Sequence, residues 1–327
     1  MSSERRPLRK ILYVALHYDY GKKEQGTSYE YNNFFKTLLR MVPEVVEFDF
    51  MTVLHENGRV KMNEMLLAEA DRVQPDLVFF CLYTDEISNE SIRKLSQHFT
   101  TFNWFCDDHW RFSNFSRHFA PSFSFISTTD VNAMPKYEKI EYRNALLTQW
   151  ACNHFDYVPV PNLEKSFDVS FVGQPHGSRK RLMRFLARHG QSVETFGRGW
   201  KHGRVPQEEM IRIFGQSRIN LNLSNASLNL HTIFRQRDQL KGRNFEIPGC
   251  GGFLLTNYVP DLERYYEIGK EIVCFENRRD LLAKIEHYLS HDVEREEIAG
   301  KGYQRMLHEH TYVHRFKELF SRMGFEV

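Results

Sequence analysis

The sequence lacks the features that would assign it to several special classes of protein. Its five cysteines include no CxxC pair, and this odd, unpatterned set favours a reducing compartment over a disulfide framework. The first apolar run, "ILYVALHY", has eight residues and no cleavage pattern after it, so we expect neither a membrane span nor a leader. The charges nearly balance, with 44 basic and 42 acidic residues, and this predicts no nucleic-acid partner. We therefore expect a cytoplasmic protein with no membrane segment.

Heptads, tandem repeats and low-complexity tracts are also missing, and no GxGxxG indicates a dehydrogenase-type dinucleotide site. What remains is a chain of 327 residues, long enough for two domains that each bury a core. Short apolar runs alternate with amphipathic segments, a pattern typical of βα units and a parallel sheet. The runs predict strands over 11–17, 45–50, 77–82, 102–106 and 123–128, and then over 169–173, 193–196, 219–223, 253–256 and 272–275.

The segments between these runs predict helices, and "YVPVPNLEKS" at 157–166 reads as a linker because it holds two prolines. Ser28, Ser88 and Asn63 are candidate helix N-caps by residue type. We predict an α/β protein with two Rossmann-like, doubly wound parallel-sheet domains, residues 1–160 and 161–305, facing each other across a cleft. The predicted helices cover 29–41, 62–73, 89–98, 179–189, 207–214, 240–249 and 278–288, followed by a helical, charged end over 292–323.

The most unusual stretch is "QLKGRNFEIPGCGGFLLTN", residues 239–257. A helix that begins near Lys241 would present backbone N–H groups, and Lys241 and Arg243 would add positive charge, which suits a diphosphate. The carboxylate of Glu246 cannot favour a phosphate, but it can accept two hydrogen bonds from the diol of a ribose. The alternative is a charged first turn of an ordinary amphipathic helix, with these side chains in water.

Several blocks in this half of the chain resemble one enzyme family. "KGRNFEIPGCGGFLLTN", "DLERYYEIGKEIVCF", "LLAKIEHYL" and "HTYVHRF" are similar to the C-terminal half of bacterial group 1 glycosyltransferases of the spore-maturation (CgeB-like) type, over roughly residues 167–320. The resemblance implies the GT-B fold, with residues 306–327 as a C-terminal helix that crosses back to the first domain. It also implies a Glu-x7-Glu motif whose second Glu binds the ribose and whose first lies near the donor sugar. Glu246 matches the second Glu, and Asp238, one methylene shorter, stands at the first.

Two further loops follow strands in the second domain, where open α/β sheets bind ligands. In "FVGQPHGSRKR", the strand ends at Gly173 and Ser178 is a natural N-cap for a helix whose Arg179 and Lys180 could hold the donor diphosphate. The alternative is a solvated basic helix start. In "FGRGW", the glycines on either side of Arg198, Gly197 and Gly199, would let a nucleobase lie against the backbone, and similar enzymes place the base near here. The alternative is a glycine-rich turn around a buried Trp200.

The first domain carries polar side chains at two strand ends. "WFCDDHWRF" places Asp107, Asp108 and His109 directly after a strand, where they could orient or deprotonate an acceptor hydroxyl, or serve as a polar turn that caps a helix. Trp110 and Phe112 could stack on a sugar ring. The spacing is not that of a DxD metal motif, and we predict no metal here. His17 ends the first strand, where a histidine could be the base of an inverting enzyme or a hydrogen-bonded structural group.

The leading prediction is a metal-independent glycosyltransferase that moves a sugar from a nucleotide diphosphate sugar, its donor substrate, to an unidentified acceptor such as a glycan, a lipid-linked group or a protein. No cofactor is expected. One alternative is a nucleotide-sugar epimerase or hydrolase on the same fold, which would need no acceptor. Another is a non-catalytic protein that binds a nucleotide or a sugar, which Asp238 in place of a Glu keeps open.

Overall fold

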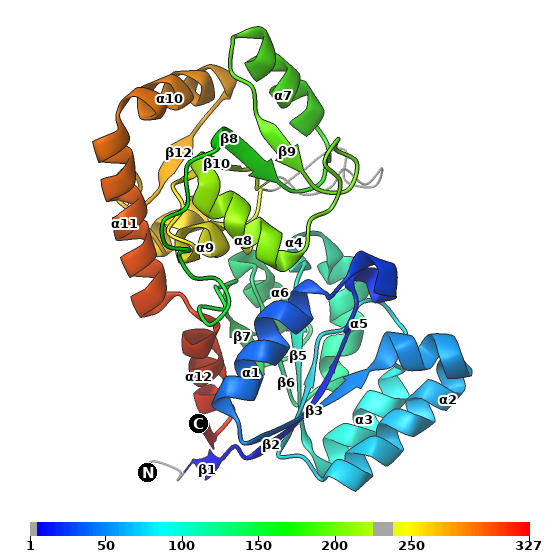
Figure 1. Ribbon diagram of the computed structural model, residues 1–327. Helices are drawn as coiled ribbons and strands as arrows, with labels where there is room; N and C mark the ends of the chain where they lie inside the picture. The colour runs from blue at the N-terminus through cyan, green and yellow to red at the C-terminus, as the bar shows by residue number, and fades with distance from the viewer. Residues whose placement is uncertain (1–4, 225–237) are drawn as a thin grey trace. The chain divides into compact units, whose positions relative to one another are not determined.

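The computed structural model describes residues 5–224 and 238–327, and the chain divides into two compact units (Figure 1). The first unit consists of Met1–Gln149 together with Tyr312–Val327, and the second of Trp150–Thr311. Each unit holds one parallel sheet of its own, so each is described separately. None of the helices in the described ranges is both long enough and apolar enough to cross a membrane.

The first unit is built on a six-stranded parallel sheet with the order β3-β2-β4-β5-β6-β7. The five strands predicted for this half are confirmed, each within three residues at its ends. The sixth, β7, was not predicted because three residues are too few to form a recognisable apolar run. The strands are β2 (Lys10–Ala15), β3 (Glu44–Asp49), β4 (Leu77–Phe80), β5 (Thr100–Phe105), β6 (Phe125–Thr128) and β7 (Ala145–Leu147).

The structure tests the three helix N-caps predicted for this unit, of which two are correct and one is wrong. Ser88 caps α3 (Asn89–His98), because its side chain accepts a hydrogen bond from the Ser91 N–H at 3.0 Å. Ser28 does the same for the Tyr31 N–H at 2.9 Å. Asn63 was wrong as a cap, since α2 begins at Phe50 and Asn63 lies inside it, where it accepts from the Ser88 N–H. The helices are η3 (Tyr31–Phe35), α1 (Lys36–Met41), α2 (Phe50–Val73), α3, α4 (Asp108–Arg111), η4 (Phe112–Ser116), α5 (Arg117–Phe119), α6 (Met134–Lys139) and α12 (Tyr312–Arg322).

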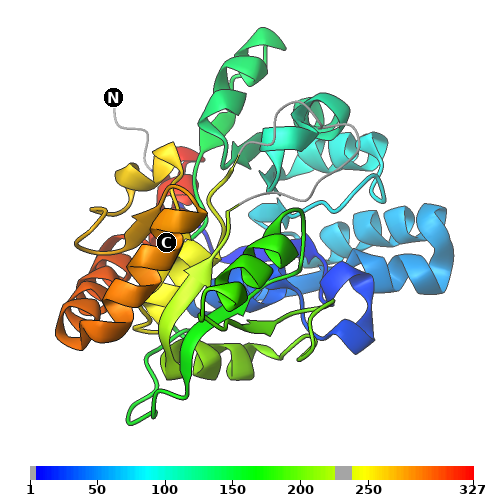
Figure 2. The ribbon, with the colours of Figure 1, turned by 90° about the horizontal axis from the view of Figure 1, so that it is seen from above.

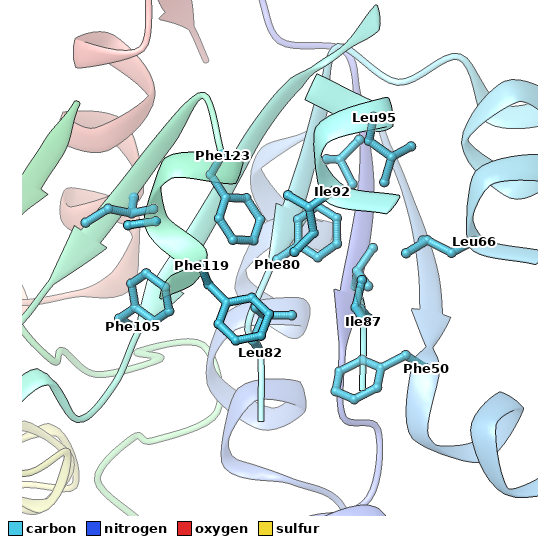
Figure 3. Packing of buried hydrophobic residues seen from close by; sticks show 14 of the residues in the cluster. Phe50, Leu66, Phe80, Leu82, Ile87, Ile92, Leu95, Phe105, Phe119 and Phe123 are labelled. Atoms are coloured by element: carbon cyan, nitrogen blue, oxygen red, sulfur yellow. The ribbon is translucent and has the colours of Figure 1, made fainter. Parts of the chain in front are cut away.

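Alternation along the strands buries apolar side chains on both faces of the first sheet. One face packs against α2 and α3, where Phe80 of β4 meets Phe50, Leu66 and Ile92 in one apolar core (Figure 3). The opposite face is aromatic. Phe79 and Trp104 pack there against Phe34 and against Phe316 of α12, with ring centroids 4.9 to 6.3 Å apart. A pair of short strands, β1 (Arg6–Pro7) and β13 (Phe325–Glu326), also joins the two ends of the chain.

The second unit has a five-stranded parallel sheet with the order β12-β11-β10-β8-β9. All five strands and the α-helices around them were predicted, whereas the short helix η8 (Pro260–Arg264) was not. Helices α10 and α11 lie next to each other and are drawn in orange in Figures 1 and 2. The elements are β8 (Phe167–Val172), α7 (Arg179–Arg188), β9 (Glu194–Phe196), α8 (Gln207–Gln216), β10 (Ser217–Asn222), α9 (Arg243–Gly249), β11 (Leu254–Asn257), β12 (Val273–Phe275), α10 (Arg278–Ser290) and α11 (Asp292–Glu309).

Both sheets reverse their strand order at one point. In the first sheet the reversal lies between β2 and β4, and in the second between β8 and β10. At such a point the connections leave toward opposite faces of the sheet, which opens a crevice at the carboxyl ends of the two strands. The fold therefore marks the residues after β2 and β4, and those after β8 and β10, as the places to look for ligand binding.

Candidate functional site

Arg179 bridges the reversal point of the second sheet. Its guanidinium donates one hydrogen bond to the carbonyl of Gln174, which follows β8, at 2.8 Å. It donates another to the carbonyl of Leu223, which follows β10, at 2.6 Å. The side chain is buried and lies over the ring of Phe171, 5.3 Å from the ring centroid. The first residue of α7 thus fixes a positive charge between the ends of the two strands.

Three further charged or titratable groups surround Arg179. Burial lowers the pKa of Arg179 to about 10, and the nearby carboxylate of Asp238 opposes this shift. Burial likewise raises the pKa of Asp238, while Lys241 and Arg179 lower it. The pKa of His176 is lowered by burial and by the positive charges of Arg179 and Lys241. These mutual effects place His176, Arg179, Asp238 and Lys241 in one cluster, named the switch-point cluster below.

Sequence reasoning found three members of the switch-point cluster and missed His176. The histidine lies in the loop between β8 and α7, in the same "GQPHGSR" stretch that drew attention to Arg179. Its position after a strand of a parallel sheet was the available signal. Only the tertiary structure shows that it lies near two cations from different segments, Arg179 of α7 and Lys241 before α9.

Side-chain amides hold the loops that carry this cluster. Asn257, at the end of β11, donates to the Asp238 carboxylate at 2.9 Å and accepts from the Ser224 N–H at 2.6 Å. Asn244 accepts from the Lys241 N–H at 3.0 Å and from the side chain of Asn222 at 3.2 Å. The turn before α9 is therefore tied to β10 through buried amides. Removing one partner would leave a buried polar group without a hydrogen bond, which costs more free energy than a formed bond contributes. These amides therefore hold the turn in one conformation.

Helix α9 is shorter than predicted, with seven residues that start at Arg243 rather than near position 240. Pro248 lies in its last turn, which agrees with the expectation that this proline shortens the helix. Arg243 is 26% exposed, and it pairs with Glu246 one turn further on. The Glu246 side chain has no exposed surface in this structure.

Glu246 lies near buried side chains from two segments, Cys152 and Tyr157 before β8 and Cys250 after α9. Burial raises the pKa values of Cys152, Tyr157 and Cys250, and the negative charge of Glu246 raises each of them further. Asp238 instead interacts with Lys241, Arg179 and Asn257. The two carboxylates of the Asp-x7-Glu pattern therefore have different surroundings. The contact between Glu246 and a ribose stays a prediction, and it requires the carboxylate to become exposed.

The glycine turn after β9 packs against the chain itself. A Cβ atom on Gly197, whose φ is +129°, would overlap the carbonyl oxygen of Gly173. The Trp200 indole N–H donates to that same oxygen at 2.7 Å. Arg198 and Gly199 are exposed in this turn. Gly197 is thus required where two loops meet, and the predicted contact of this turn with a nucleobase stays a prediction.

Arg179 and Lys180 point to different places although they are adjacent. Lys180 is exposed and lines a hollow of about 420 Å³ with Met183 of α7 and Trp200. Residues next to each other on a helix point about 100° apart, so both cannot reach one phosphate from the same direction. Ser178 is the N-cap residue of α7, but its side chain accepts no hydrogen bond from the first turn.

His17 lies directly beyond β2, at the reversal point of the first sheet. Its Nδ1 is 2.9 Å from one oxygen of Glu47 and 3.1 Å from the other. Its ring also contacts Tyr18 and Tyr31, with centroids 4.4 and 4.2 Å apart. A carboxylate on Nδ1 fixes the orientation of the imidazole, which leaves Nε2 as the nitrogen for proton transfer.

The side chains of the "CDDHW" stretch lie in different environments. Asp107 is the N-cap residue of α4, whereas Asp108 is completely buried and accepts a hydrogen bond from the Tyr137 hydroxyl at 2.7 Å. His109 Nε2 lies 3.9 Å from the buried carboxylate of Asp130. Phe112, a candidate for stacking on a sugar, is instead buried against Tyr137, with ring centroids 5.0 Å apart. Neighbouring residues at this strand end therefore lie in different environments, and Asp108 and Phe112 are buried.

Comparison with known proteins defines the fold. Residues 179–321 match a family model described as glycosyl transferase-like. Sucrose-phosphate synthase from Thermosynechococcus elongatus superposes with a TM-score of 0.64 at 10% identity, over 97% of this chain and 97% of that chain. HepE from Anabaena, in complex with UDP and glucose, superposes with a TM-score of 0.62 at 11% identity, over 96% of this chain and 98% of that chain. An α1,3-fucosyltransferase superposes with a TM-score of 0.52 at 12% identity, over 99% of this chain and 90% of that chain.

The fold is GT-B. Two Rossmann-like units, each with a parallel sheet that reverses once, account for the similarity over nearly the whole chain. No curated protein matches the sequence. The GT-B chain described here therefore shares its architecture with these structures at identities of 10 to 12%, too low to carry over residue roles.

Proposed function

We propose that this protein is a glycosyltransferase that moves a sugar from a nucleotide diphosphate sugar to an acceptor. The observation that carries the proposal is the switch-point cluster, in which two cations, a histidine and a carboxylate meet where the second sheet reverses. Support also comes from the family model, which covers Arg179 and Lys241, and from the GT-B fold shared with a protein that binds UDP and glucose. The group 1, spore-maturation (CgeB-like) subtype is part of the proposal.

The donor diphosphate would bind at the switch-point cluster. Lys241 and Arg179 supply positive charge, and the first turn of α7, which lacks a side-chain cap, supplies backbone N–H groups. During transfer the bond between the sugar and the diphosphate breaks, and negative charge develops on the leaving nucleotide. Fixed cations stabilise that charge, so the proposed transfer needs no metal ion and no cofactor at the donor site.

The remaining donor residues keep the roles that the sequence predicts. Glu246 is proposed for the ribose, with Arg243 as the partner that holds it, and Gly197 and Gly199 for the base. Asp238, fixed by Asn257, would accept a hydrogen bond from the transferred sugar. Lys180 and Arg198 are exposed and would add charge at the edge of the site.

The acceptor hydroxyl would lose its proton to His17. The proton passes to Nε2 as the hydroxyl oxygen attacks the anomeric carbon, and Glu47 stabilises the imidazolium that forms. Asp107 and His109 are proposed to orient the acceptor. Asp108 is proposed to support this segment through its bond to Tyr137 rather than to touch the substrate.

Nucleotide binding is tested first, with a thermal-shift screen of nucleoside diphosphates and their sugars in buffer without divalent ions. A ligand present at about 100 times its dissociation constant stabilises the protein by about 2.7 kcal/mol. Lys241→Ala should weaken the best ligand by at least about tenfold, because one charge-assisted contact is lost. Lys270→Ala is the matched control, since Lys270 pairs only with Glu267 among the contacts of the described residues and is exposed. Equal weakening in both variants would contradict the proposed site.

Transfer is tested with the donor identified in that screen. Incubation with donor alone should leave it unchanged, and addition of an acceptor mixture should yield a new glycoside together with free nucleoside diphosphate. Consumption of donor without acceptor would favour an epimerase or a hydrolase. Binding with no turnover in any acceptor mixture would contradict the transferase and favour a binding protein.

A further inference from the structure

Three side chains of types that can bind a metal ion lie close together near the reversal point of the first sheet. Cys81 is the first residue after β4, Cys106 the first after β5, and Glu30 precedes η3. One ligand atom from each lies within 4.8 Å of those of the other two. The Cys81 N–H also donates to the carbonyl of Val14 in β2 at 3.0 Å. Glu30, Cys81 and Cys106 are called the thiol cluster below.

The distance between the two sulfurs fits a shared metal ion. The Sγ atoms of Cys81 and Cys106 are 3.7 Å apart, and neither cysteine is in a disulfide, whose S–S bond is about 2.05 Å. A tetrahedral zinc ion with Zn–S bonds of about 2.3 Å holds two thiolates about 3.8 Å apart. The side chains therefore stand at the separation that zinc requires, without movement of the backbone.

The ligand types select the class of metal. Two thiolates are soft ligands that favour zinc and similar ions over magnesium or calcium, and a carboxylate oxygen is a common third ligand of zinc. Three protein ligands leave one tetrahedral position for water or another oxygen ligand. Cys81 is buried, and Glu30 and Cys106 are partly buried residues.

We propose that Glu30, Cys81 and Cys106 bind one zinc-class divalent ion with an open fourth position. This inference does not depend on the proposed transferase activity, because the donor residues all belong to the second unit and are proposed to bind without a metal. The ion would join the ends of β4 and β5 to the segment before η3, at the edge of the sheet where α/β proteins bind ligands. Binding displaces the protons of two thiols, so at least two protons are released per ion near neutral pH.

The test uses the full-length protein, reduced and freed of metal by dialysis. Titration with zinc chloride against a chromophoric chelator should give one ion per chain, with proton release measured in weakly buffered solution. Cobalt(II) in place of zinc should produce a thiolate-to-cobalt charge-transfer band in the near ultraviolet. A wild-type protein that binds no more zinc than Cys106→Ser would overturn the proposal.

Three variants locate the site. Cys106→Ser should weaken zinc binding and lower the intensity of the charge-transfer band by about half or more, because Cys81 is then the one thiolate ligand of the proposed site. Glu30→Gln should weaken zinc binding by at least about tenfold while the band remains. Cys274→Ser is the matched control, because Cys274 lies in β12 of the second unit and belongs to no group of metal ligands among the described residues. If Cys106→Ser does not fold, Glu30→Gln carries the test. An undiminished affinity in folded Glu30→Gln would reject the three-ligand site.

Discussion

At the scale of single residues, the switch-point cluster shows how local charge prepares a group for a ligand. His176 is partly buried beside Arg179 and Lys241, and both effects lower its pKa, so it is neutral in the free protein near pH 7. A bound diphosphate would add negative charge next to the ring. The pKa of His176 would then rise, and a proton would bind together with the ligand.

We therefore predict that nucleotide-sugar binding strengthens as the pH falls from 8 to 6, by up to about tenfold per pH unit. The sign follows because the complex binds a proton that the free protein does not. Calorimetry with a nucleotide sugar measures this directly, since its diphosphate is a diester that does not itself titrate in this range. His176→Gln should bind with a flat pH profile. A wild-type affinity that is constant or falls toward pH 6 would contradict the assignment.

At the scale of elements, packing decides where small residues are needed. In α11, the position of Gly302 lies against the carbonyl of Glu271, and a Cβ atom there would overlap it. Gly300, in the same helix, has open space at its Cβ position. The sequence shows two equivalent glycines in one helix, and the tertiary structure gives them opposite roles.

Gly302→Ala should destabilise the protein by about 1–3 kcal/mol, because the added methyl group forces α11 away from Glu271. Gly300→Ala should stabilise it by about 0.5–1 kcal/mol, since alanine is the better helix former. Chemical denaturation of both variants against wild type measures the difference. Similar free energies of unfolding in the two variants would show that the contact at Glu271 is not formed.

The starts of the helices show how far an element can be predicted. Ser28 and Ser88 were correct because a cap acts on the N–H groups of its own first turn, a local interaction that the sequence displays. The first half of α2 was missed because residues 55–61 are exposed and carry no apolar period, and Gly58, with a φ of 78°, interrupts it. Without a buried face, a helix leaves no periodic pattern.

At the scale of the whole molecule, the last helix of the chain packs into the unit formed by its first 149 residues. α12 belongs to the unit formed by residues 1–149, where Phe316 contacts Phe34, Phe79 and Trp104. These contacts join segments more than 200 positions apart in the sequence. The stability of the first unit should therefore depend on the last helix.

Phe316→Ala should cost about 3–5 kcal/mol, because it leaves a cavity among aromatic rings. Hydrogen exchange followed by mass spectrometry should show faster exchange in β2, β4 and β5, with peptides from β8 to β12 unchanged. Phe155→Ala, at a position 42% exposed in the second unit, is the control and should change stability by less than about 0.5 kcal/mol. Equal acceleration in both units would argue against α12 as a part of the first.

The sequence by itself determined the alternation of strands and helices, the α/β class and the loops at the ends of strands, because apolar periodicity and turn residues act over a few positions. It also singled out Arg179, Asp238, Lys241 and His17. Only the tertiary structure decided that His176 joins three of them, that Glu246 is buried beside Arg243, and that Glu30, Cys81 and Cys106 meet. The reason is physical: strand order brings together residues that are distant along the chain, and no local pattern encodes that order.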